Sequence, residues 1–340
     1  MISIRQGGLY LILMSVVAAY AVLNSAAGKE RKYFLATASA GGTYYPVGVA
    51  LATLTKAKLK ASHGIEMTAF NSAGSGENIQ LLRDNEAQFA ILQGLFGYYA
   101  RHGKGPIAKA GPQNALRAVT MLWQNVEQFS ILAQHLKSGT IADLANLRGQ
   151  AMALGKKNSG TLASNRFLLG NLGIDIDRDF DLIYLGYGPS ADALQRGQVA
   201  GMGTPAGVPT GAVSRIKAVL GNQISILSFT AAQAQKADGG LDLWTRYTIP
   251  ANTYPEQSEP IETISQPNIL AVRADVDAEA VYRITKVIYE NLPLLRSMHP
   301  ATTAMGLEKA LIGLPLPLHP GAARYYEEVG LDVPPGLVPK

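Results

Sequence analysis

The sequence predicts an α/β protein of two lobes joined by a hinge. The 340 residues are 47% hydrophobic, which is enough apolar chain for two packed lobes. Short apolar strands alternate with amphipathic helices in two separate blocks, a pattern typical of parallel sheets with helical crossovers. Two long, nearly uncharged runs, at 116–133 and 263–272, separate these blocks from each other and from the C-terminal part. We expect both runs to pass between the lobes and to form the hinge.

The first block covers residues 32–93. Its first helix carries Val47, Leu51 and Leu54 on one face, and Pro46 is expected at the first helical position. The block is predicted to contain strands at 32–37, 64–70 and 88–93 and helices at 46–60 and 76–83.

The second block covers residues 151–197. Ser190 is expected to cap a helix, while Gly170 and Gly197 are expected to end the two helices of the block. The block is predicted to contain strands at 151–154 and 182–185 and helices at 161–169 and 191–196.

The C-terminal part is predicted to return the chain to the first lobe. A helix at 278–292 has Val281, Ile284 and Ile288 on one face. Residues 331–340 are rich in proline and are expected to form a weakly ordered tail. The predicted boundaries are 28–122 plus 262–318 for lobe one, 123–261 for lobe two and 319–340 for a C-terminal segment.

The N-terminus has the pattern of an export signal. Arg5 is the only charged residue before Lys29, and an apolar run from 9 to 23 precedes the small residues Ser25, Ala26 and Ala27. That run is shorter than the roughly 20 residues of a membrane span. We expect a signal peptide at 1–27, cleaved after Ala27, and a periplasmic protein. The alternative is an uncleaved membrane anchor.

Composition argues against several classes of function. The chain has no cysteine, so thiolate metal sites and disulfides are excluded, and its five histidines form no metal-binding pair. No nucleophile elbow or dinucleotide fingerprint is present. The net charge of +5 is scattered, without the basic stripe of a nucleic-acid surface. We expect no enzyme activity, no cofactor, no metal site and no nucleic-acid partner.

Three loops rich in glycine and hydroxyl groups each connect a strand to a helix, at 39–46, 71–78 and 158–161. Such loops follow the carboxyl ends of strands, where open α/β sheets bind ligands. The unpaired amides at a helix N-terminus, with its partial positive charge, hold a carboxylate or phosphate well. The three loops together therefore predict an anion site. The simpler alternative is that Ser75 and Ser159 only cap their helices.

The first loop, with Gly41, Gly42, Thr43, Tyr44, Tyr45, Pro46 and Gly48, resembles the signature of the TAXI-type solute receptors of TRAP transporters. The resemblance continues in order along the chain, from about residue 33 to about 328. It rests further on Ser75-Gly76-Glu77-Asn78, on Gly155 with Ser159-Gly160-Thr161, and on His319-Pro320-Gly321-Ala322 followed by Tyr325-Tyr326.

This resemblance implies a type II periplasmic binding protein fold. It also implies a receptor that closes on a small organic anion, such as a dicarboxylate, an amino acid or an oxo-acid. The receptor would deliver that ligand to the membrane subunits of a TRAP transporter. One of Tyr44 and Tyr45 is expected to face the ligand and the other to pack. The implied ligand-binding residues are Ser39, Gly41, Gly42, Thr43, Tyr44, Asn71, Ser72, Gly74, Ser75, Asn78, Gln93, Ser159, Gly160, Thr161 and Pro205.

The sequence departs from the family pattern in the second lobe. Gly94 and Leu95 stand where a polar pair is common, and Ala200 stands where an aspartate is common. These changes favour a smaller, less polar wall and leave the ligand open. Lys156 and Lys157 either attract an anion to the cleft or are solvated loop residues. A ligand-binding partner of a membrane sensor and a receptor of an ABC importer are the alternatives with the same fold.

Overall fold

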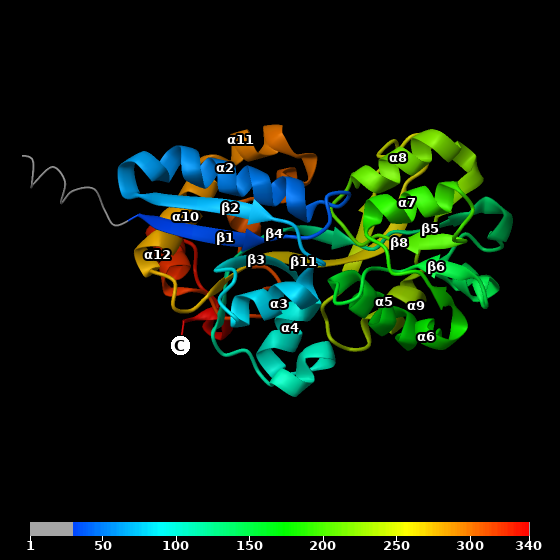
Figure 1. Ribbon diagram of the computed structural model, residues 1–340, viewed down its shortest axis with the longest axis horizontal. Helices are drawn as coiled ribbons and strands as arrows, with labels where there is room; N and C mark the ends of the chain where they lie inside the picture. Colours follow the sequence, from blue (N-terminus) through cyan, green and yellow to red (C-terminus); the bar gives the residue numbers. More distant parts are fainter. Residues whose placement is uncertain (1–29, 340) are drawn as a thin grey trace, which may run out of the picture.

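The computed structural model describes residues 30–339 and has two lobes, each built around its own sheet. The predicted signal peptide lies outside the described residues. Figure 1 shows the two sheets side by side along the longest axis, with helices on both faces of each. The predicted α/β fold with two lobes is confirmed. Among residues 30–339, no helix has the length and apolarity needed to cross a membrane.

The first sheet has six strands. Its order is β10-β11-β3-β1-β2, with β4 also paired to β11. The strands β1, β2 and β3 are parallel, whereas β11 runs antiparallel to β3, β4 and β10. The bounds are β1 (Arg31–Ala36), β2 (Ile65–Phe70), β3 (Phe89–Gln93), β4 (Leu116–Val126), β10 (Thr245–Ile249) and β11 (Ile261–Arg273).

Helices cover both faces of this sheet, with α2 on one side and α3 and α4 on the other (Figure 1). Helix α10 buries Val281, Ile284 and Ile288 on one face, as predicted from their spacing. The helices are α2 (Tyr44–His63), α3 (Ser75–Arg83), α4 (Gly94–His102), α10 (Ala278–Glu290), α11 (Leu292–Met298) and α12 (Pro320–Glu328).

The second sheet has five short strands in the order β7-β6-β8-β5-β9. In Figure 1, α7 and α8 lie on one side of it and α5, α6 and α9 on the other. Its strands are β5 (Phe129–Leu132), β6 (Ala151–Ala153), β7 (Asp181–Leu182), β8 (Gly201–Gly203) and β9 (Ile224–Ile226). Its helices are α5 (Gly160–Asn171), α6 (Ile176–Asp179), α7 (Tyr187–Gln195), α8 (Gly211–Leu220) and α9 (Ala231–Asp238).

Short 3-10 helices connect these elements. They are η1 (Gly105–Ala110), η2 (Ala133–His135), η3 (Ile141–Leu147), η4 (Gly221–Gln223), η5 (Pro300–Ala304), η6 (Leu307–Lys309) and η7 (Pro335–Leu337).

The two predicted crossing runs form the connection between the sheets. The first run becomes β4 in the six-stranded sheet and, two residues later, β5 in the five-stranded sheet. At this junction the Glu127 amide donates to the Ile264 carbonyl at 2.9 Å, and the Thr263 hydroxyl donates to the Glu127 carbonyl at 2.7 Å. The start of β11 therefore lies against the junction between β4 and β5, and both lobes are attached to this pair of segments.

Four local predictions are wrong, each for a steric or hydrogen-bonding reason. Helix α2 begins at Tyr44, so Pro46 is its third residue, where a helix still needs no amide donor. Gly170 lies inside α5, which ends one residue later at Asn171. Ser190 lies inside α7, and its hydroxyl donates to the Gly186 carbonyl at 2.9 Å instead of capping the helix. The tail is anchored, since Leu337 is buried and its carbonyl accepts from the Leu318 amide.

Candidate functional site

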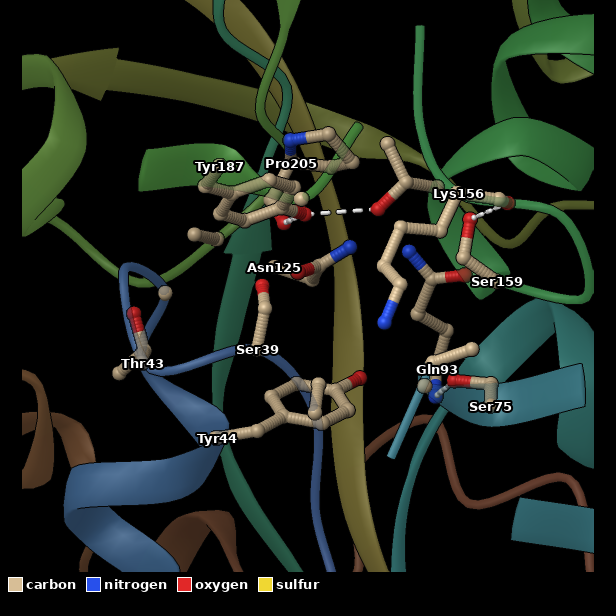
Figure 2. Close-up of a pocket in the computed structure, with 18 of the residues that line it drawn as sticks. Ser39, Thr43, Tyr44, Ser75, Gln93, Asn125, Lys156, Ser159, Tyr187 and Pro205 are labelled. Atoms are coloured by element: carbon tan, nitrogen blue, oxygen red, sulfur yellow. Dashed lines mark hydrogen bonds between the residues drawn. The ribbon is translucent and has the colours of Figure 1, made fainter. Parts of the chain in front are cut away.

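A small cavity, partly open to solvent, lies between the two sheets; the empty space there is about 460 Å³, part of which is open solvent. Nineteen residues from both sides line it. Figure 2 shows Tyr44, Ser39 and Gln93 reaching it from one side and Lys156, Ser159 and Tyr187 from the other. The two sides approach each other closely, because a Cβ atom on Gly186 would lie 3.2 Å from the Cβ atom of Ser39.

Four helices begin at the wall of this cavity. The first residues of α2, α3, α5 and α7 are Tyr44, Ser75, Gly160 and Tyr187, and all four line it. Each helix N-terminus carries a partial positive charge of about half an elementary charge and leaves amide donors without intrahelical partners. The fold therefore concentrates positive potential on one small cavity.

Lys156 is the one charged side chain among the nineteen lining residues. Figure 2 shows its ammonium group pointing into the cavity. The neighbouring Lys157 has a different role, since its ammonium lies 4.9 Å from the centre of the Tyr184 ring, outside the lining.

A chain of buried amides forms the back of the cavity. The Tyr44 hydroxyl donates to Asn268 Oδ1 at 2.5 Å, and Asn268 Nδ2 donates to Asn125 Oδ1 at 3.4 Å. This chain uses the Asn125 oxygen and leaves its Nδ2 group, which is fully buried, without a partner among the described residues. Such a donor is costly to bury unless a ligand or water accepts from it.

A second chain crosses the upper wall of the cavity in Figure 2. The Tyr187 hydroxyl donates to the Pro205 carbonyl at 2.6 Å, so the Thr161 hydroxyl, 2.7 Å away, is the donor to Tyr187. Burial raises the pKa of the Tyr187 hydroxyl, and that of Tyr44, above the ordinary tyrosine value. Both phenols are therefore neutral hydrogen-bonding groups at neutral pH.

The two serines of the predicted helix caps behave differently. Ser159 caps α5, since its hydroxyl accepts from the Leu162 amide at 3.0 Å and donates to the Lys156 carbonyl at 2.7 Å. Ser75 does not cap α3, because its hydroxyl accepts from the Gln93 amide at 3.0 Å and ties the helix to strand β3. Both serines line the cavity while serving the fold.

Eleven of the fifteen predicted ligand-binding residues line the cavity. They are Ser39, Gly42, Thr43, Tyr44, Gly74, Ser75, Gln93, Ser159, Gly160, Thr161 and Pro205. Of the two adjacent tyrosines, Tyr44 lines the cavity and Tyr45 does not.

The other four predicted residues do not line the cavity but hold its loops. Asn78 Nδ2 donates to the carbonyls of Thr37 and Ile91 at 2.8 and 2.9 Å, and its oxygen accepts from Ser72 at 2.6 Å. Asn71 donates to the Ala38 carbonyl at 2.8 Å. Gly41 lies against the other side of the cleft, since a Cβ there would be 2.7 Å from the Gly188 amide nitrogen.

Several lining residues carry no signal in the sequence pattern that predicts the site. Asn125 lies in an apolar run that the pattern assigns only to the hinge, and Tyr187 stands at a helix start that was placed four residues too late. The remaining ones are small or apolar and carry no chemical signal: Ala38, Ala73, Leu185, Gly186 and Ala206. With Pro205 they make the wall small and weakly polar.

The two sides of the cleft touch each other beyond the cavity. The Ala212 amide donates to the Gly41 carbonyl at 3.2 Å, and the Thr43 hydroxyl donates to the Gly207 carbonyl at 3.2 Å. On the α3 side, a Cβ atom on Gly76 would lie 2.4 Å from the Asn158 oxygen. The structure is therefore a closed form, in which glycines allow the two backbones to approach.

Two α/β lobes on either side of a small cavity define the class of fold, that of the periplasmic binding proteins. Within that class, the chain belongs to the NMT1-like family, whose profile matches residues 35–330.

Solved structures share the fold at low sequence identity. The periplasmic binding protein BugD is 14% identical and has a TM-score of 0.53, with 89% of this chain and 95% of BugD covered. MatC from Rhodopseudomonas palustris, solved with bound malate, is 15% identical and has a TM-score of 0.52, with 88% and 97% covered. A protein from Bordetella bronchiseptica RB50 is 14% identical and has a TM-score of 0.51, with 91% and 85% covered.

Proposed function

We propose that this protein is an extracytoplasmic solute receptor that captures a small organic anion between its lobes. The observation that carries the proposal is the convergence of four helix N-termini and Lys156 on a cavity whose lining has no carboxylate. Amides and hydroxyls at helix starts bind carboxylates without further help from arginine. Malate bound to MatC, a structural relative, supports a small acid as the ligand.

Capture proceeds by closure of one lobe on the other. The ligand first contacts the loops of lobe one (28–122 plus 262–318), which carry Ser39, Gly42 and Ser75. Lobe two (123–261) then rotates about the paired segments at Glu127 and Ile264 and brings Lys156 and Thr161 to the ligand. Since the closed form has more contacts with the anion, ligand binding shifts the population toward it.

The captured ligand is delivered to a membrane transporter. The resemblance of the loop at 39–46 to TAXI-type receptors supports a TRAP transporter as the partner. Membership of the NMT1-like family fits a receptor of an ABC importer equally well. Transport in membrane vesicles separates the two: uptake that needs an ion gradient supports TRAP, and uptake that needs ATP supports an ABC importer. Both require export of the chain, consistent with the predicted signal at 1–27.

The ligand class is tested by thermal unfolding of the purified protein in the presence of small mono- and dicarboxylates. A ligand that binds only the folded state stabilises it by about 2.7 kcal/mol at a hundredfold excess over its dissociation constant. We expect a rise in the unfolding temperature with at least one acid and none with neutral sugars. A protein that responds to no acid contradicts the proposed ligand class.

A further inference from the structure

The lining of the cavity carries positive charge and no negative charge, and this bears on the chemical nature of the ligand. Lys156 is the single charged lining residue, and no aspartate or glutamate is among the nineteen. The four helix N-termini add positive potential of the same sign. We infer that the cavity selects acids that carry no ammonium group and rejects the corresponding amino acids. This inference rests on the proposed anion-receptor function.

The neutral groups of the wall also favour acceptors on the ligand. Asn125 Nδ2 is held as a free donor by the chain from Tyr44 through Asn268. The protons of Thr161 and Tyr187 are already committed to protein acceptors, so these two hydroxyls present only neutral acceptor oxygens, which supply no counter-ion for an ammonium group. Figure 2 shows the Asn125 nitrogen and the Lys156 ammonium facing the same space. A carboxylate, keto or hydroxyl oxygen satisfies these donors, whereas an ammonium group has nothing to offer them.

One acceptor at the wall remains without a partner, Gln93 Oε1. It lies close to the start of α5, since a Cβ atom on Gly160 would be 2.3 Å from it. An amide oxygen carries no net charge, so it leaves a buried ammonium group without a counter-ion. A charge taken out of water without a counter-ion is strongly disfavoured.

The two nearby carboxyl groups do not supply that counter-ion. Glu127 is buried behind the cavity, bonded to the Trp244 indole at 3.0 Å, and burial raises its pKa to about 8, so it is largely neutral at pH 7. Glu77, in the first turn of α3, accepts from the Ala73 amide at 2.5 Å and is not a lining residue.

The test compares ligands that share a carbon skeleton and differ in the amino group. Calorimetric titration of the purified protein at pH 7 uses pyruvate against alanine, 2-oxoglutarate against glutamate, and succinate against aspartate. We expect every acid that binds to do so at least about tenfold more tightly than its amino partner, a difference smaller than the cost of an unpaired buried charge. Equal or tighter binding of the amino acids overturns the inference and leaves the anion-receptor function intact.

If none of these compounds binds, the proposed ligand class is wrong, and the inference that rests on it fails as well. A variant provides a further test of the acid-to-amino preference. Gln93→Glu adds a carboxylate to the wall with little change of shape, and we expect it to narrow the acid-to-amino ratio about tenfold. Gln80→Glu, on the exposed face of α3, adds the same charge outside the cavity and should leave the ratio unchanged. If Gln93→Glu folds poorly, titration of the ligand pairs into the unmodified protein still tests the inference.

Discussion

The backbone amide of Glu77 donates a hydrogen bond to the carbonyl oxygen of Asn158 at 3.0 Å. Glu77 belongs to the first turn of α3, beside the first sheet, and Asn158 belongs to the loop before α5, beside the second. Asn158 has a φ of 60°, the left-handed conformation that turns its carbonyl toward α3. This bond joins the two lobes directly, and it can form only when they are closed.

Gly76 makes this approach possible and gives the first prediction. In Gly76→Ala, the new methyl group would lie 2.4 Å from the Asn158 oxygen, so the lobes cannot close fully. We expect ligand affinity to fall about tenfold or more, equivalent to about 1.4 kcal/mol. Calorimetry measures the affinity, and small-angle X-ray scattering measures the contraction on ligand addition. Gly170→Ala is the matched control, because that helical glycine has nothing within 4 Å. Full closure and unchanged affinity in Gly76→Ala would contradict the closed-form interpretation.

Lys156 and Lys157 provide a matched pair for the second prediction. Lys156→Met removes the one charge in the lining, and we expect about a tenfold loss of affinity for a carboxylate, with a weaker dependence on salt. Lys157→Met removes an equal charge from outside the cavity and should change the affinity little. Titrations at low and high salt test both variants. Equal losses in the two would mean that only general attraction of anions matters.

Asn78 gives a prediction about stability alone. Asn78→Ala removes hydrogen bonds to the buried carbonyls of Thr37 and Ile91, although the Thr37 carbonyl can still accept from the Ser72 hydroxyl. Loss of buried partners of this kind costs about 1–3 kcal/mol of unfolding free energy for each group left unpaired. Urea unfolding measures the loss. Because Asn78 does not line the cavity, the fraction that remains folded should bind ligand normally. If Asn78→Ala loses ligand binding but keeps its stability, Asn78 belongs to the ligand site.

Glu127 makes the unfolding free energy depend on pH. Burial raises the pKa of its carboxyl from 4.5 to about 8 in the folded protein. The folded state therefore holds this proton between pH 4.5 and pH 8, while the unfolded state releases it. The contribution of Glu127 to stability is complete below pH 4.5 and is lost as the pH rises through 8, by at most about 1.4 kcal/mol per pH unit.

Glu127→Gln isolates this effect, because glutamine keeps the shape but does not titrate. Urea unfolding at pH 5, 6, 7 and 8 compares the two proteins. We expect the stability of Glu127→Gln relative to the unmodified protein to increase with pH across this window. A difference that stays constant would mean that the Glu127 carboxyl is already ionised in the folded state.

The alternation of strands and helices made the fold class and most elements of the blocks at 32–93 and 151–197 predictable, but not the elements between 201 and 249. Each strand of the first block was placed within about one residue, because apolar runs bounded by glycine and polar residues leave few alternatives. Helix α4 was missed, since Gly94 and Gly97 weaken the helical pattern. Strand β10 was missed as well; it lies within the predicted second lobe but pairs with β11 in the first sheet. Pairing between strands of different blocks leaves no pattern in the sequence of either strand.

The cavity was predictable only where backbone and hydroxyl groups cluster in sequence. The loops at 39–46 and 158–161 combine glycine, serine and threonine before a helix, and they do line the cavity. Asn71, Ser72 and Asn78 have the same residue types, yet they bond to the carbonyls of Ala38 and Thr37, just after strand β1. The type of a polar residue does not reveal which side of a loop it faces. Asn125 had no signal at all, because its role depends on Asn268, which is far away in sequence.

The close approach of the two sides, as at Ser39 and Gly186, has a kinetic consequence. Opening of the cleft requires the hydrogen bonds of Thr43, Glu77 and Ala212 across it to break. Where exit of a bound molecule requires this opening, its residence time depends on the opening rate of the loaded protein.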